Sequence, residues 1–133
     1  MLSLSLISCD KEQIITENEV PSTINTYITS HFASHNVLQY LKDKDGLELT
    51  YDITLSDGVF LEFNRKKEII DIESNSALPP SVIPTKITDY VTQNFSSNFI
   101  KAWELDDKIQ KVTLDNGIEL EFTKSGDFKR IDS

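Results

Sequence analysis

Two histidines in this sequence have the spacing of a metal site. His31 and His35 lie four residues apart, the separation at which two imidazoles on one helix face can bind the same zinc ion. The three residues between them include no glutamate, so the HExxH pattern is absent. In the internal repeat described below, the two histidines align with Asn94 and Asn98. We therefore interpret them as the polar end of a helix and predict no metal site.

Two glutamates recur at equivalent places in two similar stretches. Glu62 lies in SDGVFLEF (56–63) and Glu121 in DNGIELEF (115–122). Paired carboxylates can act as general acid and base, but these two lie on the polar side of predicted hairpins, where solvated and cross-strand roles are common. The chain has one cysteine and four glycines, with no Ser/His/Asp set and no glycine-rich phosphate loop. The sequence predicts neither an enzyme nor a cofactor.

Acidic residues dominate the charge of the chain. Asp and Glu total 22 against 13 Lys and Arg, which gives a net charge of −9. Such a surface repels phosphate backbones, so no nucleic-acid partner is predicted. Two acidic pairs, Asp43 with Asp45 and Asp106 with Asp107, leave a second function open: a small-ligand or cation-binding periplasmic sensor.

The single cysteine, Cys9, ends the apolar start MLSLSLISC. Leu6-Ile7-Ser8-Cys9 resembles the lipobox of bacterial lipoproteins, and the polar run after it resembles the tether of many Bacteroidota lipoproteins. The resemblance implies diacylglyceryl transfer to the Cys9 sulfur and a lipid anchor in the periplasm, at the outer membrane or on the cell surface. It departs from the pattern in lacking a basic segment before the apolar run. We expect residues 1–19 to be a remnant signal and tether outside the fold.

The two similar stretches belong to a longer internal duplication. Val20-Pro21 in the first copy matches Ile83-Pro84 in the second, and the correspondence continues to the end of the chain. The copies cover residues 20–74 and 83–133, and a linker over 75–82 contains two consecutive prolines. We expect residues 20–133 to form one domain, because one copy alone would bury little apolar surface.

Each copy is predicted to be a helix followed by four antiparallel strands. A stripe of apolar residues at helical spacing marks each helix, and alternation of apolar and polar residues then marks the strands. Asp57-Gly58 and Asn116-Gly117 are strong signals for tight hairpin turns, because both residue types tolerate positive φ. The stripe residues are Ile24, Tyr27, Ile28 and Phe32 in the first copy and Ile87, Tyr90, Val91 and Phe95 in the second.

With these helix starts, turns and Leu-Glu-Phe segments (61–63 and 120–122), the chain resembles the PepSY-like family of small exported bacterial proteins, which is related in fold to the beta-lactamase inhibitory protein. The resemblance spans about residues 20–133. It implies an α+β fold in which tandem duplicated α-β4 units form an antiparallel sheet of about eight strands, with two helices packed on one face. The other face would be left open, and in relatives that face can bind a protein.

Three aromatic residues on predicted strands are candidates for such binding: Tyr40, Phe60 and Trp103. Strand alternation places Phe60 opposite the core residues, and exposed aromatics commonly anchor protein interfaces. A core position remains open for Trp103. The first hypothesis is thus a non-catalytic envelope lipoprotein that binds another envelope or exported protein through the open face, as an inhibitor or modulator.

Overall fold

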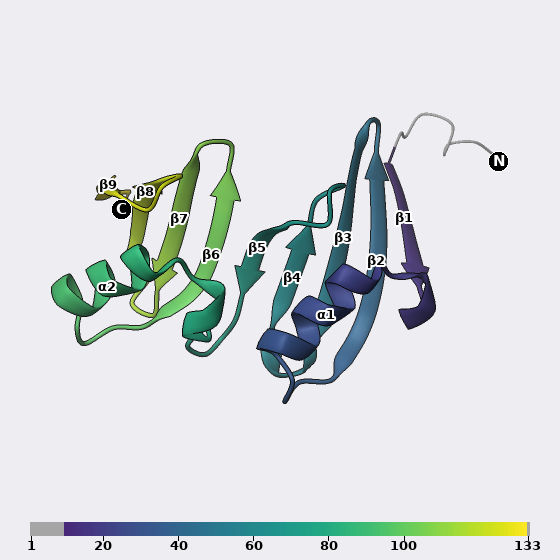
Figure 1. The fold of residues 1–133 in the computed structure, drawn as a ribbon, viewed down its shortest axis with the longest axis horizontal. Coiled ribbons are helices and arrows are strands. Elements are labelled where there is room, and N and C mark those ends of the chain that lie inside the picture. Colours follow the sequence, from purple (N-terminus) through teal and green to yellow (C-terminus); the bar gives the residue numbers. More distant parts are fainter. Residues whose placement is uncertain (1–9, 133) are drawn as a thin grey trace.

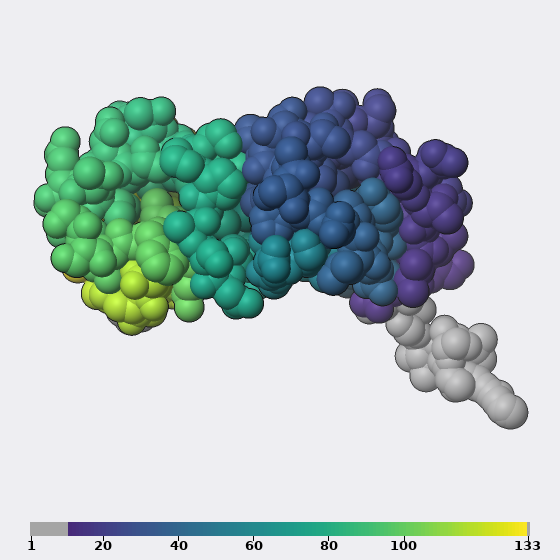
Figure 2. Space-filling model, turned by 90° about the horizontal axis from the view of Figure 1, so that it is seen from below, coloured from purple at the N-terminus to yellow at the C-terminus, as the bar shows by residue number. Residues whose placement is uncertain are grey.

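The computed structural model of this chain describes residues 10–132, which form one antiparallel sheet with two helices on one of its faces (Figure 1). The sheet has nine strands, and each strand pairs with its neighbours in the sequence. The molecule is therefore elongated along the direction in which the strands succeed one another, as Figure 2 shows from below. No helix in the described part of the chain is long and apolar enough to cross a membrane.

Both copies contain the predicted series of elements. The first comprises α1 (Ser22–His31), β2 (Val37–Asp45), β3 (Glu48–Leu55), β4 (Phe60–Phe63) and β5 (Ile69–Glu73). The second comprises α2 (Thr85–Asn94), β6 (Ile100–Asp106), β7 (Ile109–Leu114), β8 (Glu119–Thr123) and β9 (Phe128–Ile131). In each copy one helix is followed by four antiparallel strands, as predicted.

The helices pack on the sheet through equivalent residues. Ile24 and Ile28 are buried in α1, as are Ile87 and Val91 in α2. A proline precedes each helix, where its missing N–H leaves no intrahelical hydrogen bond unmade. The duplicated apolar stripe is thus the surface by which each helix covers its half of the sheet.

The two copies also repeat finer details. Register shifts occur near the start of β2 and of β6, and again at the ends of the β4–β5 and β8–β9 pairings. Tyr27 contacts Phe63 edge-to-face with ring centroids 5.3 Å apart, and Tyr90 contacts Phe122 in the same way at 5.6 Å. The aromatic residues of the helices are therefore part of the core, as the duplication indicates.

Residues 10–19 differ from the expected tether. Asp10–Ile15 forms a strand, β1, which pairs with β2 and adds a ninth strand to the predicted eight. Ile15 lies opposite Tyr40 and is 7% exposed, whereas Ile14 is 68% exposed. Burial of Ile15 and pairing of the free edge of β2 explain why this polar segment joins the sheet. Cys9 lies outside the described residues.

The two hairpin turns have different backbone geometries. Asp57 and Gly58 both have positive φ (65° and 77°), as the Asp-Gly signal predicts. In the second copy Gly117 has a φ of 91°, and the Asn116 side chain accepts a hydrogen bond from the Ile118 N–H at 3.1 Å. Asn116 therefore supports its turn through a side-chain hydrogen bond.

Gly58→Ala is expected to lower the free energy of unfolding by about 2–3 kcal/mol, against about 1 kcal/mol for Gly117→Ala. Both positions have positive φ, but a Cβ at Gly58 would overlap the side-chain amide of Asn75, whereas one at Gly117 would meet nothing within 4 Å. Urea unfolding of both variants gives the comparison. Equal losses would mean that the Asn75 amide moves away without cost.

Candidate functional site

The open face of the sheet, which neither helix covers, carries one of the three predicted aromatic residues. Phe60 is half-buried and lies opposite Thr54 of β3 and Glu73 of β5, both on this face. Its place confirms the alternation argument for this strand. Binding of a protein by Phe60 stays a prediction.

Tyr40 and Trp103 lie on the helix-covered face instead. The open-face placement expected for Tyr40 is corrected, and Trp103 has the core position that the sequence left open. Tyr40 pairs with Ile53, which is fully buried, and Trp103 pairs with Ile72 and is 7% exposed. The Trp103 indole N–H donates a 2.9 Å hydrogen bond to Gln110 Oε1. A buried, hydrogen-bonded indole is a core residue and offers no accessible anchor.

The two histidines have separate partners. His31 Nδ1 lies 2.9 Å from Ser81 Oγ, whereas His35 Nδ1 lies 3.1 Å from the Ser56 carbonyl oxygen and 3.5 Å from Asp57 Oδ2. The two imidazole rings therefore have different hydrogen-bond partners and share none of these. Over residues 10–132 no three histidine, cysteine or acidic side chains are grouped so that they could hold a metal ion.

The acidic pairs proposed for a sensor are also far apart. Asp43 and Asp45 lie on β2, whereas Asp106 ends β6 and Asp107 follows it in the turn. Three strands separate β2 from β6, which places the pairs roughly 19 Å apart at the usual strand spacing. The two pairs therefore lie at separate places on the sheet, and a sensor that uses either of them stays a prediction.

The acidic residues that do lie together form a row across the middle of the open face, which sequence reasoning missed. Strand register places Asp52 opposite Glu62, Glu62 opposite Asp71, and Asp71 opposite Glu104. Side chains in such cross-strand pairs have Cβ atoms about 5 Å apart, and like charges there are unfavourable. We call these four residues, contributed by β3, β4, β5 and β6, the acidic row.

Basic residues continue the row toward the C-terminal edge of the sheet. Lys111 lies opposite Glu104 and Glu121, and its Nζ is 3.0 Å from Asp132 Oδ2. Arg130 pairs with the buried Glu121 at 2.9 Å. Glu119, Glu121 and Asp132 of the second copy are therefore paired with basic residues, whereas the acidic row extends from the first copy to β6, the first strand of the second.

Burial and neighbouring carboxylates raise the pKa of Glu62 and Asp71, two members of the row. Burial, followed by the neighbouring carboxylates of Glu73 and Glu104, raises the pKa of Asp71 to about 7. Burial also raises the pKa of Glu62, and the charge of Asp52 adds to the effect. A cation placed against the row would reverse these shifts, because it favours the charged carboxylates.

Two hollows on the open face adjoin the acidic row. One, of about 400 Å³, is lined by Glu73, Glu104 and Glu119 together with Lys101 and Ala102. The other, of about 340 Å³, is lined by Glu62 and by residues at the far end of β3 and β4, with Leu47 and Ile70 among its lining residues. The arrangement can accept cationic side chains beside apolar ones, and Phe60 lies on the same face, opposite Glu73 of the first hollow.

Asp71→Asn is expected to raise the free energy of unfolding at pH 8 by about 1–2 kcal/mol, a figure reduced for partial solvation. The folded-state pKa lies above the unfolded one, so the native protein binds more protons and its stability falls as the pH rises from about 4 to about 7. The gain should therefore disappear near pH 4.

Thermal unfolding at both pH values checks the Asp71 result. Asp106→Asn is the matched control, because it removes one exposed carboxylate outside the row. If Asp106→Asn raised the free energy of unfolding equally, the effect would come from the change in net charge. A gain from Asp71→Asn that persisted unchanged at pH 4 would contradict the repulsion within the row.

Comparison with known proteins gives a match to a family model and to solved structures. The family model is described as "Putative beta-lactamase-inhibitor-like, PepSY-like" and matches residues 5–71 and 49–130, in two overlapping segments. The first match covers most of the first copy, and the second runs from β3 of the first copy to residue 130. No curated protein matches the chain in sequence.

The solved structures share the fold over nearly their whole length. A "putative periplasmic protein" from Bacteroides vulgatus has a TM-score of 0.87 at 29% identity, covering 92% of this chain and 98% of that one. Another B. vulgatus periplasmic protein, of unknown function, has a TM-score of 0.85 at 30% identity, covering 93% and 99%. A "putative calcium-regulated periplasmic protein" from Bacteroides thetaiotaomicron has a TM-score of 0.87 at 26% identity, covering 92% and 97%.

Proposed function

This chain belongs to the PepSY-like family, and from that membership and the open sheet face we propose that it is a non-catalytic envelope lipoprotein that binds and modulates another exported protein. The description of its structural neighbours as periplasmic proteins supports the compartment. Anchoring through Cys9 and modulation of a partner are parts of this proposal.

The observation that carries the proposal is the acidic row on an uncovered face. Repulsion among Asp52, Glu62, Asp71 and Glu104 lowers the stability of the chain by itself and would be relieved by a cationic partner. Phe60 supplies an aromatic contact at the same place, and the two hollows give side chains of a partner somewhere to enter. The partner surface is therefore expected to present lysine or arginine around an apolar centre.

The test is affinity capture from cross-linked native envelopes with a matched pair of variants. Phe60→Ala/Glu62→Lys alters the open face, whereas Phe99→Ala/Asp89→Lys removes an exposed phenylalanine and reverses an exposed acid away from it. A partner held by the wild type and the control pair, and lost by the open-face pair, supports the proposal. Equal retention by both pairs would place the interface elsewhere, and capture of nothing would refute the binding role.

A divalent cation is the second candidate ligand. The hollow lined by Glu73, Glu104 and Glu119 favours it, as does the calcium-regulated description of one structural neighbour. Carboxylates are the usual calcium ligands. Their side chains would have to rearrange, since residues 10–132 hold no ready-made group of three ligands.

Thermal unfolding with and without calcium decides this second function. A rise in melting temperature with calcium that Glu104→Gln abolishes would support it. A calcium effect that Glu104→Gln leaves intact, or no calcium effect, would refute a site in this hollow and leave the protein-binding function as the proposal.

A further inference from the structure

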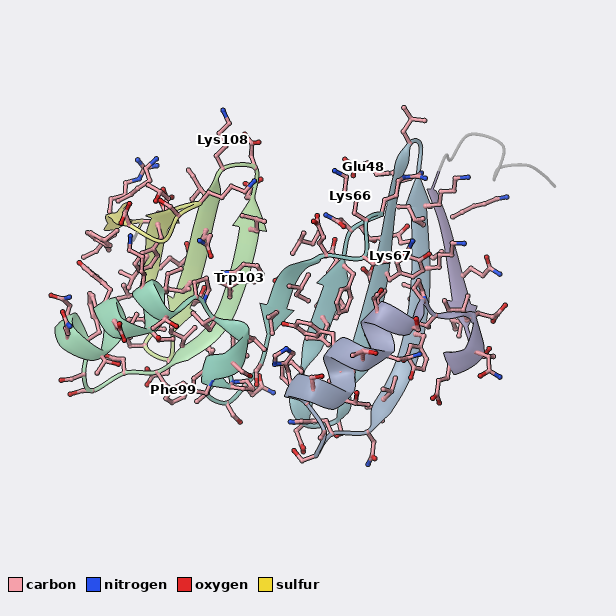
Figure 3. The ribbon with its side chains drawn as sticks, in the orientation of Figure 1. Glu48, Lys66, Lys67, Phe99, Trp103 and Lys108 are labelled. Atoms are coloured by element: carbon pink, nitrogen blue, oxygen red, sulfur yellow. The ribbon has the colours of Figure 1, made fainter. Side chains whose placement is uncertain are left out.

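Lysines gather at one end of the first copy, although the chain as a whole is strongly acidic. We call the group of Lys11, Lys42, Lys44, Lys66 and Lys67 the basic end. The register pairs Lys11 with Lys44 and places Lys42 opposite Tyr51, so these three lie on the helix side of the sheet. Lys66 and Lys67 follow in the turn between β4 and β5, and Figure 3 shows Lys66 toward the same end of the first copy as the β2–β3 hairpin.

Acidic side chains of this region lie largely on the opposite face. Along β2 the sequence alternates lysine and aspartate, so that Asp43 and Asp45 belong to the open face while Lys42 and Lys44 belong to the helix face. The helix α1 carries no acidic residue. In the turn, Glu68 accepts a hydrogen bond from Asn64 Nδ2 at 3.1 Å. The strand pleat thus separates positive from negative charge.

An apolar side chain projects at the tip of the same end. Leu47, in the turn between β2 and β3, is 92% exposed. Arg65 donates a 3.0 Å hydrogen bond from Nη2 to the Leu47 carbonyl oxygen, which ties this tip to the β4–β5 turn that carries Lys66 and Lys67. The lysines and the leucine are therefore held as one surface.

The chain enters the sheet at this end. Asp10, the first residue of β1, lies opposite Asp45 at the start of the β2–β3 turn, and Cys9 immediately precedes it. A lipid on Cys9 would consequently hold the basic end and Leu47 next to the bilayer. Basic side chains at an anionic bilayer are favourable, and one acyl chain alone binds marginally, so a second contact adds to anchoring.

We propose that the basic end, with Leu47 at its tip, rests on the anionic lipid headgroups of the membrane to which Cys9 is anchored. The helix side of this end then faces the bilayer. Leu47 also lines the smaller hollow of the open face, so the part of that face around Phe60 and the larger hollow stays accessible to a partner. This inference rests on the proposed lipoprotein for its setting. It requires nothing of the partner.

The first test measures headgroup binding without the lipid. Full-length Cys9→Ser protein is mixed at low salt with vesicles of equal parts phosphatidylglycerol and phosphatidylethanolamine, and with vesicles of phosphatidylcholine alone. We expect binding to the anionic vesicles only, reduced by about tenfold or more in Lys44→Gln/Lys66→Gln/Lys67→Gln. The control, Lys108→Gln/Lys124→Gln/Lys129→Gln, removes three exposed lysines of the second copy and should retain binding.

The second test locates Leu47. In the Cys9→Ser background, Leu47→Cys provides a single thiol for an environment-sensitive dye, and Asp107→Cys provides the same at the β6–β7 turn. A blue shift on anionic vesicles at position 47 and none at 107 supports the proposed orientation. Equal shifts, equal losses from the two lysine triples, or no binding by Cys9→Ser would overturn the proposal.

A separate measurement distinguishes failure of the lipoprotein proposal from failure of the membrane-contact proposal. Metabolic labelling of wild type and Cys9→Ser with a radioactive fatty acid reports on the anchor alone. Absent labelling would refute the lipoprotein while leaving vesicle binding by the basic end as an independent result. Labelling together with vesicle binding that the lysine triple leaves intact would keep the anchor and refute this surface.

Discussion

Trp103→Ala is expected to lower the free energy of unfolding by about 3–5 kcal/mol, the range for truncation of a large buried aromatic. The indole is 7% exposed and lies between Ile72 and Val112, both fully buried. Its removal leaves a cavity beside the β5–β6 pairing, where the two copies join in the continuous sheet. It also leaves Gln110 Oε1 without its hydrogen-bond donor in a buried place, which adds to the cost.

Two further variants separate these contributions. Trp103→Phe keeps an aromatic ring but loses the indole N–H, so a loss of about 1–3 kcal/mol is expected from the unpaired Gln110 oxygen. Phe60→Ala, at a half-buried position on the open face, should cost less than about 1.5 kcal/mol. Urea unfolding followed by circular dichroism measures all three. A loss for Trp103→Ala no larger than that for Phe60→Ala would contradict the core position.

The duplicated elements were predictable because each rests on local periodicity. The stripe containing Ile24 and Ile28 in one helix, and Ile87 and Val91 in the other, recurs at helical spacing, and two copies give the same prediction twice. The turn at Asp57-Gly58 could be predicted equally well, since few residue pairs tolerate positive φ at both positions. The family resemblance pointed to the same architecture.

The faces of Tyr40 and Trp103 could not be derived from alternation. Register shifts interrupt β2 between Val37 and Gln39, and β6 between Ile100 and Ala102. An irregularity of this kind changes the parity of every residue beyond it, so that Ile100 and Trp103 point to the same face although three residues separate them. Composition carries no signal for such a shift.

The acidic row could not be predicted from the sequence either, because it too depends on strand register. Its members come from four strands, and only the register of all three pairings shows that Asp52, Glu62 and Asp71 are successive neighbours. Within the sequence each is an ordinary polar residue of an alternating strand. β1 was missed because Ile15 is the one buried side chain among residues 11–15, so this segment lacks the pattern of a strand.

Phe122→Ala is expected to lower the free energy of unfolding by about 3–5 kcal/mol. The ring is fully buried, meets the ring of Tyr90 edge-to-face at 5.6 Å and lies 5.7 Å from that of Phe128. Phe63 has the equivalent place in the first copy, where it meets Tyr27. Phe63→Ala should therefore cost a similar amount, and guanidinium unfolding of both variants provides the comparison.

The same pair of variants tests whether the two copies unfold together. Buried residues of both copies form a single core cluster, and β5 pairs with β6 across the junction. A substitution in either copy should thus shift one common transition, with tryptophan fluorescence and circular dichroism giving the same midpoint. Two separated transitions in Phe122→Ala would show that the first copy remains folded alone. In that case the β5–β6 pairing, and with it the continuous acidic row, would depend on the stability of the second copy.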